Sequence, residues 1–482
     1  MIQKYWQKYV NLSEPVKMSI WFLICSFFQK GIAMLTTPIF TRVMTEYEFG
    51  RYSIYNSWLF FFMALISLNI AGGYYMRGLV VNEDDRDVLT SSMLGLTATM
   101  CGISLVVYYI FSNVLNQITE LNTFLFSIMV LQIFLSNTYY IWMNKQRVDY
   151  NYKPIVKITL LVTLLNPIVS VFAVLNADAC LQVEARVLAS VIIEIVLYSY
   201  LIAFLIKKGR KLYKRKYWQE AILFSLPLVP HYLSKIVLSQ ADRVMIGSYC
   251  GLEEVGYYSV AYSIAVIILI FNQAVSSSLD PWLYKSIKEK SFSSISDISI
   301  KILILMSLLN LSVIAFAPEV LKIFAPANFY TAVWVIPPIT ASVFFMFMYD
   351  LFTAFQYYYA KTKWIMLASL VGALLNIVLN SLFIPLFGFI AAGYTTLICY
   401  ILFGMAHYFF MCKVCDKYLE GIRPYDIKKI ICIGALVVAF AMMMILLYPY
   451  MLIRYALIFA IILLLYKKRK EITELMKGLK GK

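Results

Sequence analysis

The chain has 482 residues, of which 62% are hydrophobic and only 14% are charged. Soluble domains average roughly 45–50% apolar and about 25% charged residues, so this composition excludes an ordinary soluble protein and indicates folding in lipid. A net charge of +16 would suit nucleic-acid binding, but the basic residues lie between long apolar runs and form no separate basic and aromatic face. We therefore expect no nucleic-acid partner.

Long apolar runs follow one another along nearly the whole chain. A bilayer core of about 30 Å needs roughly 20 apolar helical residues, whereas the strands of a membrane barrel are shorter and alternate apolar with polar positions. We therefore predict an all-α polytopic membrane protein with fourteen transmembrane helices. Their approximate ranges are 17–41, 51–75, 88–112, 119–143, 155–176, 184–206, 218–239, 256–279, 295–317, 331–355, 364–386, 388–412, 429–447 and 449–466.

The distribution of basic residues predicts the orientation of these helices. If both termini are cytoplasmic, most of the 42 Lys and Arg residues fall in the inner connections and the two tails. Few fall in the outer connections, which is the pattern of the positive-inside rule. We therefore predict a multi-pass protein with both termini in the cytoplasm.

A short motif occurs twice and indicates an internal duplication. Arg42-Val43-Met44 precedes Glu48-Phe49-Gly50-Arg51-Tyr52-Ser53, and Arg243-Val244-Met245 precedes Glu254-Val255-Gly256-Tyr257-Tyr258-Ser259. The Glu and Gly of each copy suit a helix–turn–helix connection. Because a basic segment at 207–216 separates six predicted helices from the next six, we predict two parallel six-helix bundles, as in many transporters. The predicted divisions are 1–207, 208–415, and 416–482 with two additional helices and a basic tail.

Five basic side chains are candidates for binding an anionic substrate. A charge at bilayer depth costs at least about 2.5–3.5 kcal/mol, so Lys30, near the middle of the first helix, favours a cavity-facing position. Lys235 lies nearer a membrane surface, where it either faces a cavity, snorkels or pairs with a carboxylate. Arg42 and Arg243 either line an outer mouth or hold the motif turns. Arg77 either anchors at the inner interface or contacts a phosphate by a bidentate pair.

Three acidic residues lie in or beside predicted helices: Glu194, Asp350 and Asp280. Such residues bind coupling protons or sodium ions in some transporters, or they neutralise buried lysines. The sequence has no Gly-x-x-x-x-Gly-Lys phosphate loop, zinc-ligand spacing or nucleophile motif. We therefore expect no cofactor, no metal and no enzymatic activity.

Two segments resemble a known transporter family. Pro38-Ile39-Phe40-Thr41-Arg42-Val43-Met44-Thr45, with Glu48-Phe49-Gly50-Arg51-Tyr52, resembles the first outer turn of Wzx-type flippases for O-antigen and capsular polysaccharide repeat units. Asp242-Arg243-Val244-Met245-Ile246-Gly247, with Gly251-Leu252 and Val255-Gly256-Tyr257-Tyr258-Ser259-Val260-Ala261-Tyr262, is similar to their seventh-to-eighth helix signature. These flippases belong to the multidrug/oligosaccharidyl-lipid/polysaccharide exporter (MOP) superfamily, and the helix layout agrees along nearly the whole chain.

The resemblance implies two six-helix bundles around a central cationic cavity. It implies alternating access, by which undecaprenyl-pyrophosphate-linked oligosaccharide crosses the bacterial inner membrane for surface polysaccharide biosynthesis. The implied partners are this substrate, membrane lipid, a coupling ion (H⁺ or Na⁺) and a polysaccharide polymerase complex. In the related lipid II flippases the last two helices form a groove for the lipid tail, which is an analogy for this chain.

Two alternatives remain open. A multidrug or cation antiporter of the same superfamily usually has twelve helices and an acidic residue in its first or second helix, whereas this chain has Lys30 there. Lys30 therefore favours an anionic substrate. A membrane polysaccharide polymerase fits less well, because no outer connection is long enough for a catalytic loop.

Overall fold

A computed structural model describes residues 13–467 of the protein. Every regular element within these residues is a helix, and no strand occurs among them. Helices satisfy their own backbone hydrogen bonds, as lipid requires of any segment that crosses it. In this part of the chain, twelve helices are long and apolar enough to cross a membrane. The prediction of an all-α polytopic membrane protein is confirmed.

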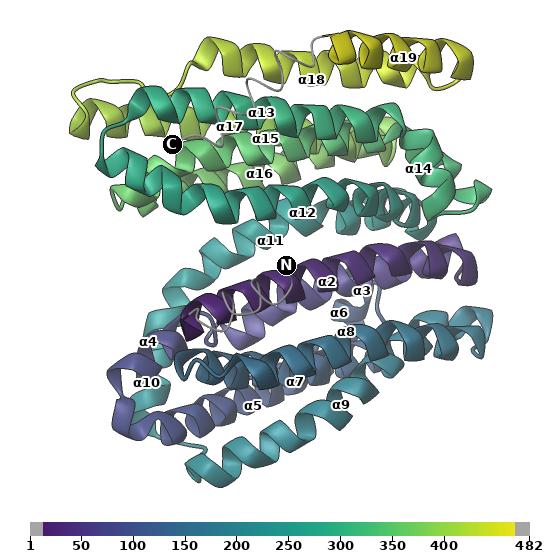
Figure 1. Ribbon diagram of the computed structural model, residues 1–482. Coiled ribbons are helices and arrows are strands. Elements are labelled where there is room, and N and C mark those ends of the chain that lie inside the picture. Colours follow the sequence, from purple (N-terminus) through teal and green to yellow (C-terminus); the bar gives the residue numbers. More distant parts are fainter. Residues whose placement is uncertain (1–12, 468–482) are drawn as a thin grey trace, which may run out of the picture. The chain divides into compact units, whose positions relative to one another are not determined.

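The chain divides into two compact units, and the first ends at Val244. The elements that belong to it are α2 (Glu14–Val43), α3 (Glu46–Ser67), α4 (Tyr74–Val81), η1 (Glu83–Asp85), α5 (Arg86–Ile110), α6 (Ser112–Thr119), α7 (Thr123–Val148), α8 (Tyr152–Leu175), η2 (Ala179–Leu181), α9 (Gln182–Gly209), α10 (Arg215–Ser225), η3 (Leu226–Leu228) and most of α11 (Val229–Tyr249). Helices α5, α7 and α9 pack against one another, and α2 packs along α8 (Figure 1).

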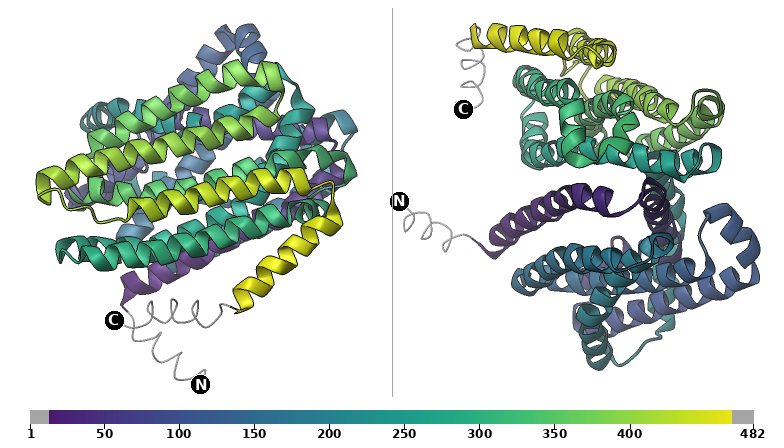
Figure 2. Two further views of the ribbon diagram at one scale, coloured as in Figure 1. Left: turned by 90° about the horizontal axis from the view of Figure 1, so that it is seen from above. Right: turned by 90° about the vertical axis from the view of Figure 1, so that its right-hand side faces the viewer.

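The second unit begins at Met245. Its elements are α12 (Leu252–Lys288), α13 (Phe292–Ala315), α14 (Ala317–Phe324), η4 (Ala327–Trp334), α15 (Ile336–Tyr358), α16 (Thr362–Phe387), α17 (Ile390–Tyr418), α18 (Ile427–Leu447) and α19 (Met451–Lys467). Helix α15 is the centre of this unit, because it contacts α12, α13, α16, α17 and α18 and most of its side chains are buried. Figure 2 shows these long helices running alongside one another. The divisions expected at 207 and 415 stay predictions.

Two of the fourteen predicted helices are not among the twelve candidate spans, so the count of fourteen is not confirmed. The range predicted at 51–75 is broken: α3 ends at Ser67, and Leu68 and Asn69 have positive φ angles of 49° and 48°. A left-handed pair cannot continue a right-handed helix. The range predicted at 449–466 forms α19, whose 17 residues are fewer than the roughly 20 of a typical span.

An ion-pair network holds the turn of the first motif against the start of α9. Arg51 donates to both carboxylate oxygens of Glu184, at 2.5 and 3.1 Å, and lies 3.6 Å from a Glu48 oxygen. Glu48 also accepts a hydrogen bond from the Val183 backbone N–H at 3.2 Å. Thr45 caps α3 by accepting from the Glu48 N–H. The motif therefore has a structural role in this turn.

Helix α19 is fixed to α14 by a similar pair in the second unit. Arg454, which is 2% exposed, donates to Glu319, and the Tyr455 hydroxyl donates to the same carboxylate oxygen at 2.7 Å. Arg454 interrupts an apolar sequence, and this partner explains how the helix accommodates its charge. A buried arginine is tolerated where a carboxylate pairs with it.

The basic segment at 207–216 is fastened to the first turns of α5. The Ser91 hydroxyl donates to the Lys211 carbonyl oxygen at 2.9 Å, and the Trp218 indole N–H donates to the Ser92 carbonyl oxygen at 2.9 Å. Lys214 donates to Asp85, and this hydrogen bond raises the pKa of Lys214 above its ordinary value. The basic segment 207–216, which has the sequence of a linker, therefore packs as part of the first unit.

Gly95 on α5 is required by this close approach. A Cβ atom built at Gly95 would lie 2.1 Å from the backbone oxygen of Leu212, which is far inside van der Waals contact. Gly102, two turns further along the same helix, has no atom within 4 Å of the corresponding position. The two glycines form a matched pair in which only the first is constrained by packing.

We expect Gly95→Ala to lower the free energy of unfolding by about 1–3 kcal/mol, since a methyl group there overpacks the contact. Gly102→Ala should leave it unchanged or raise it by at most about 1 kcal/mol, because alanine favours the helix. Each purified variant is heated, and size-exclusion chromatography then measures the fraction of protein that stays monodisperse. Equal heat resistance of the two variants would contradict the packing argument.

Candidate functional site: a cationic pocket in the first unit

A pocket of about 530 Å³ lies inside the first unit, between the end of α3, the turn that follows it, α7 and α11. Two cationic side chains line it, Arg147 from α7 and Lys235 from α11. Polar and aromatic side chains complete the lining, among them Asn137, Tyr140 and Tyr232. Ligand pockets in proteins have volumes of about 300–1,000 Å³, so this pocket has the size of a binding site.

The turn after α3 forms one wall of the pocket and has an unusual backbone conformation. Leu68 and Asn69 both have left-handed backbone angles, which are costly in non-glycine residues and persist only where the surroundings enforce them. The Asn144 side chain donates to the Ala71 carbonyl oxygen at 2.7 Å and ties the turn to α7. A Cβ atom at Gly72 would lie 2.9 Å from the Asn69 side-chain oxygen, so a larger residue there would have to displace the Asn69 side chain.

One side of α7 presents a polar stripe to the pocket. Asn137, Tyr140, Asn144 and Arg147 all line it, and their spacing of three, seven and ten residues puts them on the same side of a helix. The Asn137 side-chain amide donates to the Thr97 hydroxyl at 2.7 Å, which fixes that amide in place. The stripe is therefore fixed at Asn137 and carries its positive charge at the other end, on Arg147.

The two cations of the pocket form no ion pair with any carboxylate in the part of the chain that the structure describes. The Arg147 guanidinium lies over the Phe22 ring, 4.6 Å from its centroid, and its buried Nε has no hydrogen-bond partner. Buried donors are nearly always satisfied in native proteins, so this nitrogen is suited to an acceptor from a ligand. Lys235 is exposed to the pocket. Two uncompensated positive charges in one concavity attract anions.

The other predicted cations lie elsewhere in the first unit. Lys30 is half-buried on α2 and is not among the residues that line the pocket. Arg77 is exposed on the short helix α4. Arg42 donates to the Pro38 carbonyl oxygen of its own helix at 2.7 Å. Arg243 is buried and donates to the Ser239 carbonyl oxygen at 3.2 Å and to the Gln240 side-chain oxygen at 3.3 Å. Substrate binding by these four residues stays a prediction.

Of the three predicted acids, only Glu194 is buried. It lies on α9 and accepts a hydrogen bond from the Gln132 amide at 3.3 Å, while the Gln132 oxygen accepts from the Tyr55 hydroxyl at 2.8 Å. The second carboxylate oxygen of Glu194 has no hydrogen-bond partner. Asp280 and Asp350 are exposed on α12 and α15 of the second unit. Glu194 thus has the environment of a group that binds a proton or a cation.

Arg147 was not predicted to bind substrate. In the sequence it is one of the basic residues of the inner connections, whose distribution predicts the orientation of the helices. The missed signal is the polar stripe, because Asn137, Tyr140 and Asn144 recur at helical spacing along this membrane helix and lead to Arg147. A stripe of this kind on a membrane helix faces protein or water rather than lipid.

Comparison with known proteins gives the family. Residues 16–287, more than half of the chain, match the model of the family described as "Polysaccharide biosynthesis protein", and residues 227–382 match the MatE family model. The chain is similar to "Lsg locus putative protein 1" of Haemophilus influenzae, with 24% identity over 282 residues that cover 57% of this chain and 67% of the relative.

Two solved structures have a similar fold. The lipid II flippase MurJ in an inward closed conformation matches with a TM-score of 0.66 and 14% identity, covering 91% of this chain and 100% of that chain. An inward-facing MATE multidrug transporter of the MOP superfamily matches with a TM-score of 0.58 and 10% identity, covering 83% and 95%. The chain therefore belongs to the polysaccharide biosynthesis protein family and has the fold of the MOP-superfamily transporters.

Proposed function

We propose that this protein is a flippase that carries lipid-linked oligosaccharide across the bacterial inner membrane by alternating access. The pocket of Arg147 and Lys235 would bind the anionic phosphate groups that join the glycan to its lipid. The observation that carries this proposal is that both cations line one pocket and neither pairs with a carboxylate in the described chain. Membership of the polysaccharide biosynthesis protein family supports the same substrate class.

The chemistry of the pocket suits a diphosphate with a sugar beside it. A guanidinium binds phosphate oxygens through two parallel hydrogen bonds, and an ammonium adds a point charge. Tyr140 and Tyr232 provide aromatic surface for a sugar ring. At about 530 Å³ the pocket is too small for a whole oligosaccharide, so the charged junction would bind here while the rest of the glycan occupies a wider path.

An antiporter for cationic drugs is the second candidate, and the MATE fold supports it equally. The specific observation in its favour is Glu194, a buried carboxyl group that has no cationic partner in the described chain. The two uncompensated cations of the pocket oppose a cationic substrate. In the flippase we assign Glu194 to ion coupling, with H⁺ or Na⁺ as the ion. Wzx-type activity, a polymerase partner and cytoplasmic termini belong to the same proposal.

The substrate proposal predicts that Arg147→Gln and Lys235→Gln each lower flipping by about tenfold or more, since each removes a charge-assisted hydrogen bond worth roughly 1.5–3 kcal/mol. Arg147→Lys should recover part of the activity. The measurement is transport of a fluorescent diphosphate-linked oligosaccharide lipid in vesicles, with surface polysaccharide display as a cellular readout. Lys30→Ala, tested alongside, should abolish display if Lys30 also lines the path.

The matched control is Lys216→Gln, which removes an exposed cation of the same unit that does not line the pocket. It should leave transport unchanged. Normal transport by the Arg147→Gln, Lys235→Gln double variant, at normal protein levels, would refute the proposed anion site. Faster transport of a cationic dye by that double variant would instead support the antiporter.

The coupling proposal predicts that Glu194→Gln abolishes the response of transport to an ion gradient. Glutamine keeps an oxygen that accepts from the Gln132 amide, so the substitution removes the titrating group and keeps this hydrogen bond. The measurement is the transport rate in vesicles with and without an imposed H⁺ or Na⁺ gradient. Asp280→Asn, which changes an exposed acid, should retain the response. If neither an H⁺ gradient nor an Na⁺ gradient changes the transport rate of the wild-type protein, Glu194 has no coupling role.

A further inference from the structure

Three lysines of the second unit lie together where α16 begins and α17 ends, and we call them the lysine cluster. Lys361 immediately precedes α16, and Lys413 and Lys417 lie in the last turns of α17. Helices α16 and α17 pack against each other (Figure 1). Nothing in the proposed transport path uses these residues.

Aromatic rings bring the ammonium groups of the cluster together. The Lys361 and Lys417 nitrogens lie 5.4 and 5.7 Å from the centroid of the same Tyr418 ring. The Lys361 ammonium also donates a hydrogen bond to the Tyr418 oxygen. Lys413 precedes Lys417 by four residues, a spacing that puts their Cβ atoms about 5–6 Å apart on one side of the helix. The structure thus gathers three positive charges from two helices.

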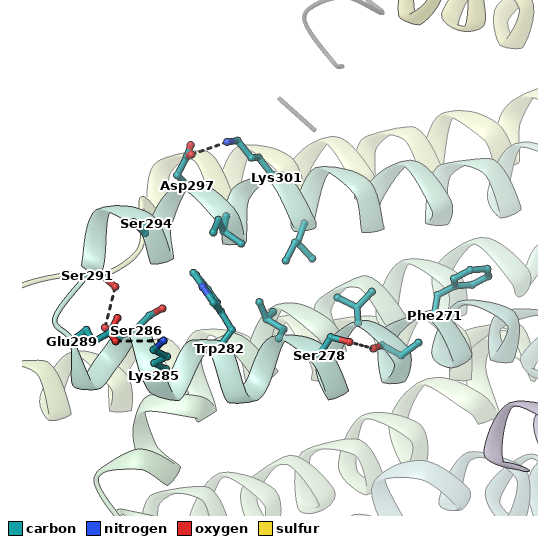
Figure 3. A pocket seen from close by; sticks show the side chains of 15 residues that line it. Phe271, Ser278, Trp282, Lys285, Ser286, Glu289, Ser291, Ser294, Asp297 and Lys301 are labelled. Carbon is teal, nitrogen blue, oxygen red and sulfur yellow. Dashed lines mark hydrogen bonds and ion pairs between the residues drawn. The ribbon is translucent and has the colours of Figure 1, made fainter. Parts of the chain in front are cut away.

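These charges are not neutralised within the described part of the chain. None of the three lysines forms an ion pair there, and the neighbouring Asp416 pairs with Arg423 at 2.7 Å. An aromatic ring attracts an ammonium but has no net charge, so it positions a lysine without cancelling its charge. The lysines that line the groove between α12 and α13 differ, because Lys285 and Lys301 each pair with a carboxylate of their own helix (Figure 3).

The lysine cluster lies at the depth of lipid head groups. Helix α17 has 29 residues, which is about 44 Å at 1.5 Å per residue and exceeds a bilayer core of about 30 Å, so its charged last turns extend into the head-group layer. The Lys413 nitrogen lies 5.1 and 4.5 Å from the ring centroids of Trp364 and Phe409, and Phe409 is 56% exposed. Tryptophan is typical of the membrane–water interface, so these rings mark the boundary between head groups and acyl chains.

From these positions and charges, we propose that the lysine cluster binds a phospholipid with a net negative head group, of the phosphatidylglycerol class. The lysines contact its phosphate, and the exposed Phe409 side chain packs against its acyl chains. Clusters of lysines beside a membrane helix attract anionic lipids. An ethanolamine or choline phospholipid has the same phosphate but adds a positive charge, which the three unneutralised lysines repel.

The experiment is native mass spectrometry of the purified full chain with an equimolar mixture of glycerol, ethanolamine and choline phospholipids of matched acyl chains. We expect the glycerol lipid to be retained about tenfold more than either zwitterionic lipid, because only its head group has a net negative charge. The Lys361→Gln, Lys413→Gln, Lys417→Gln triple variant should lose this preference.

Further variants separate a bound lipid from general attraction to a positive surface. Tyr418→Leu keeps all three lysines but removes the ring over which two of them lie, so retention of the glycerol lipid should fall by about threefold. Lys417→Gln alone should lower it by about as much. Lys285→Gln is the matched control, because it removes an exposed lysine of the same unit that already pairs with Glu289. It should keep the preference.

Three results would each overturn the proposal: equal retention of the glycerol and choline lipids by the wild type, an unchanged preference in the triple variant, or an equal loss in Lys417→Gln and Lys285→Gln. A polyprenyl diphosphate added to the mixture tests a different occupant. If the triple variant loses this lipid but keeps the glycerol lipid, the cluster binds the transported class of lipid, and the proposal is wrong. Arg147 and Lys235 are intact in every variant, so these outcomes do not depend on the proposed transport site.

Discussion

The cost of an uncompensated charge in lipid governs how this chain is built. Water is absent from the bilayer core, so a buried ion is stable only with a partner of opposite charge or a path to the surface. The chain follows this rule where it needs rigid joints. Arg51 and Glu184 join the first motif turn to α9, and Arg454 and Glu319 join α19 to α14. Each pair lets a polar residue interrupt an apolar sequence without opening the structure to water.

Arg147, Lys235 and Glu194 have no partner of opposite charge in the described chain, and the proposed function gives each of them a role in transport. Arg147 and Lys235 share a pocket, and Glu194 is buried with one oxygen unsatisfied. The left-handed turn after α3, which forms one wall of that pocket, is tied to α7 by the Asn144 amide. A pocket wall that is already fixed in this way needs less ordering when an anion binds, which reduces the entropy lost on binding.

The lengths and composition of the apolar runs were sufficient to predict the all-α membrane fold, because lipid imposes length and composition on every span. They failed where the backbone departs from a helix: nothing in apolar content shows that Leu68 and Asn69 are left-handed and end α3 early. The pocket position of Arg147 was not predicted either, because an arginine that anchors a helix at the membrane surface and one that lines a pocket look alike in the sequence. Only the position of a side chain in three dimensions separates these two uses.

The fastening of segment 207–216 to α5 has a consequence for biogenesis. The hydrogen bonds of Ser91 and Ser92 and the close approach at Gly95 join α5 to residues that follow α9. All of these residues lie before Val244, so the joint can close while the rest of the chain is still being synthesised. Domains of large proteins fold in order from the N-terminus during translation. The joint would then retain a completed first unit in the membrane while the ribosome inserts the second.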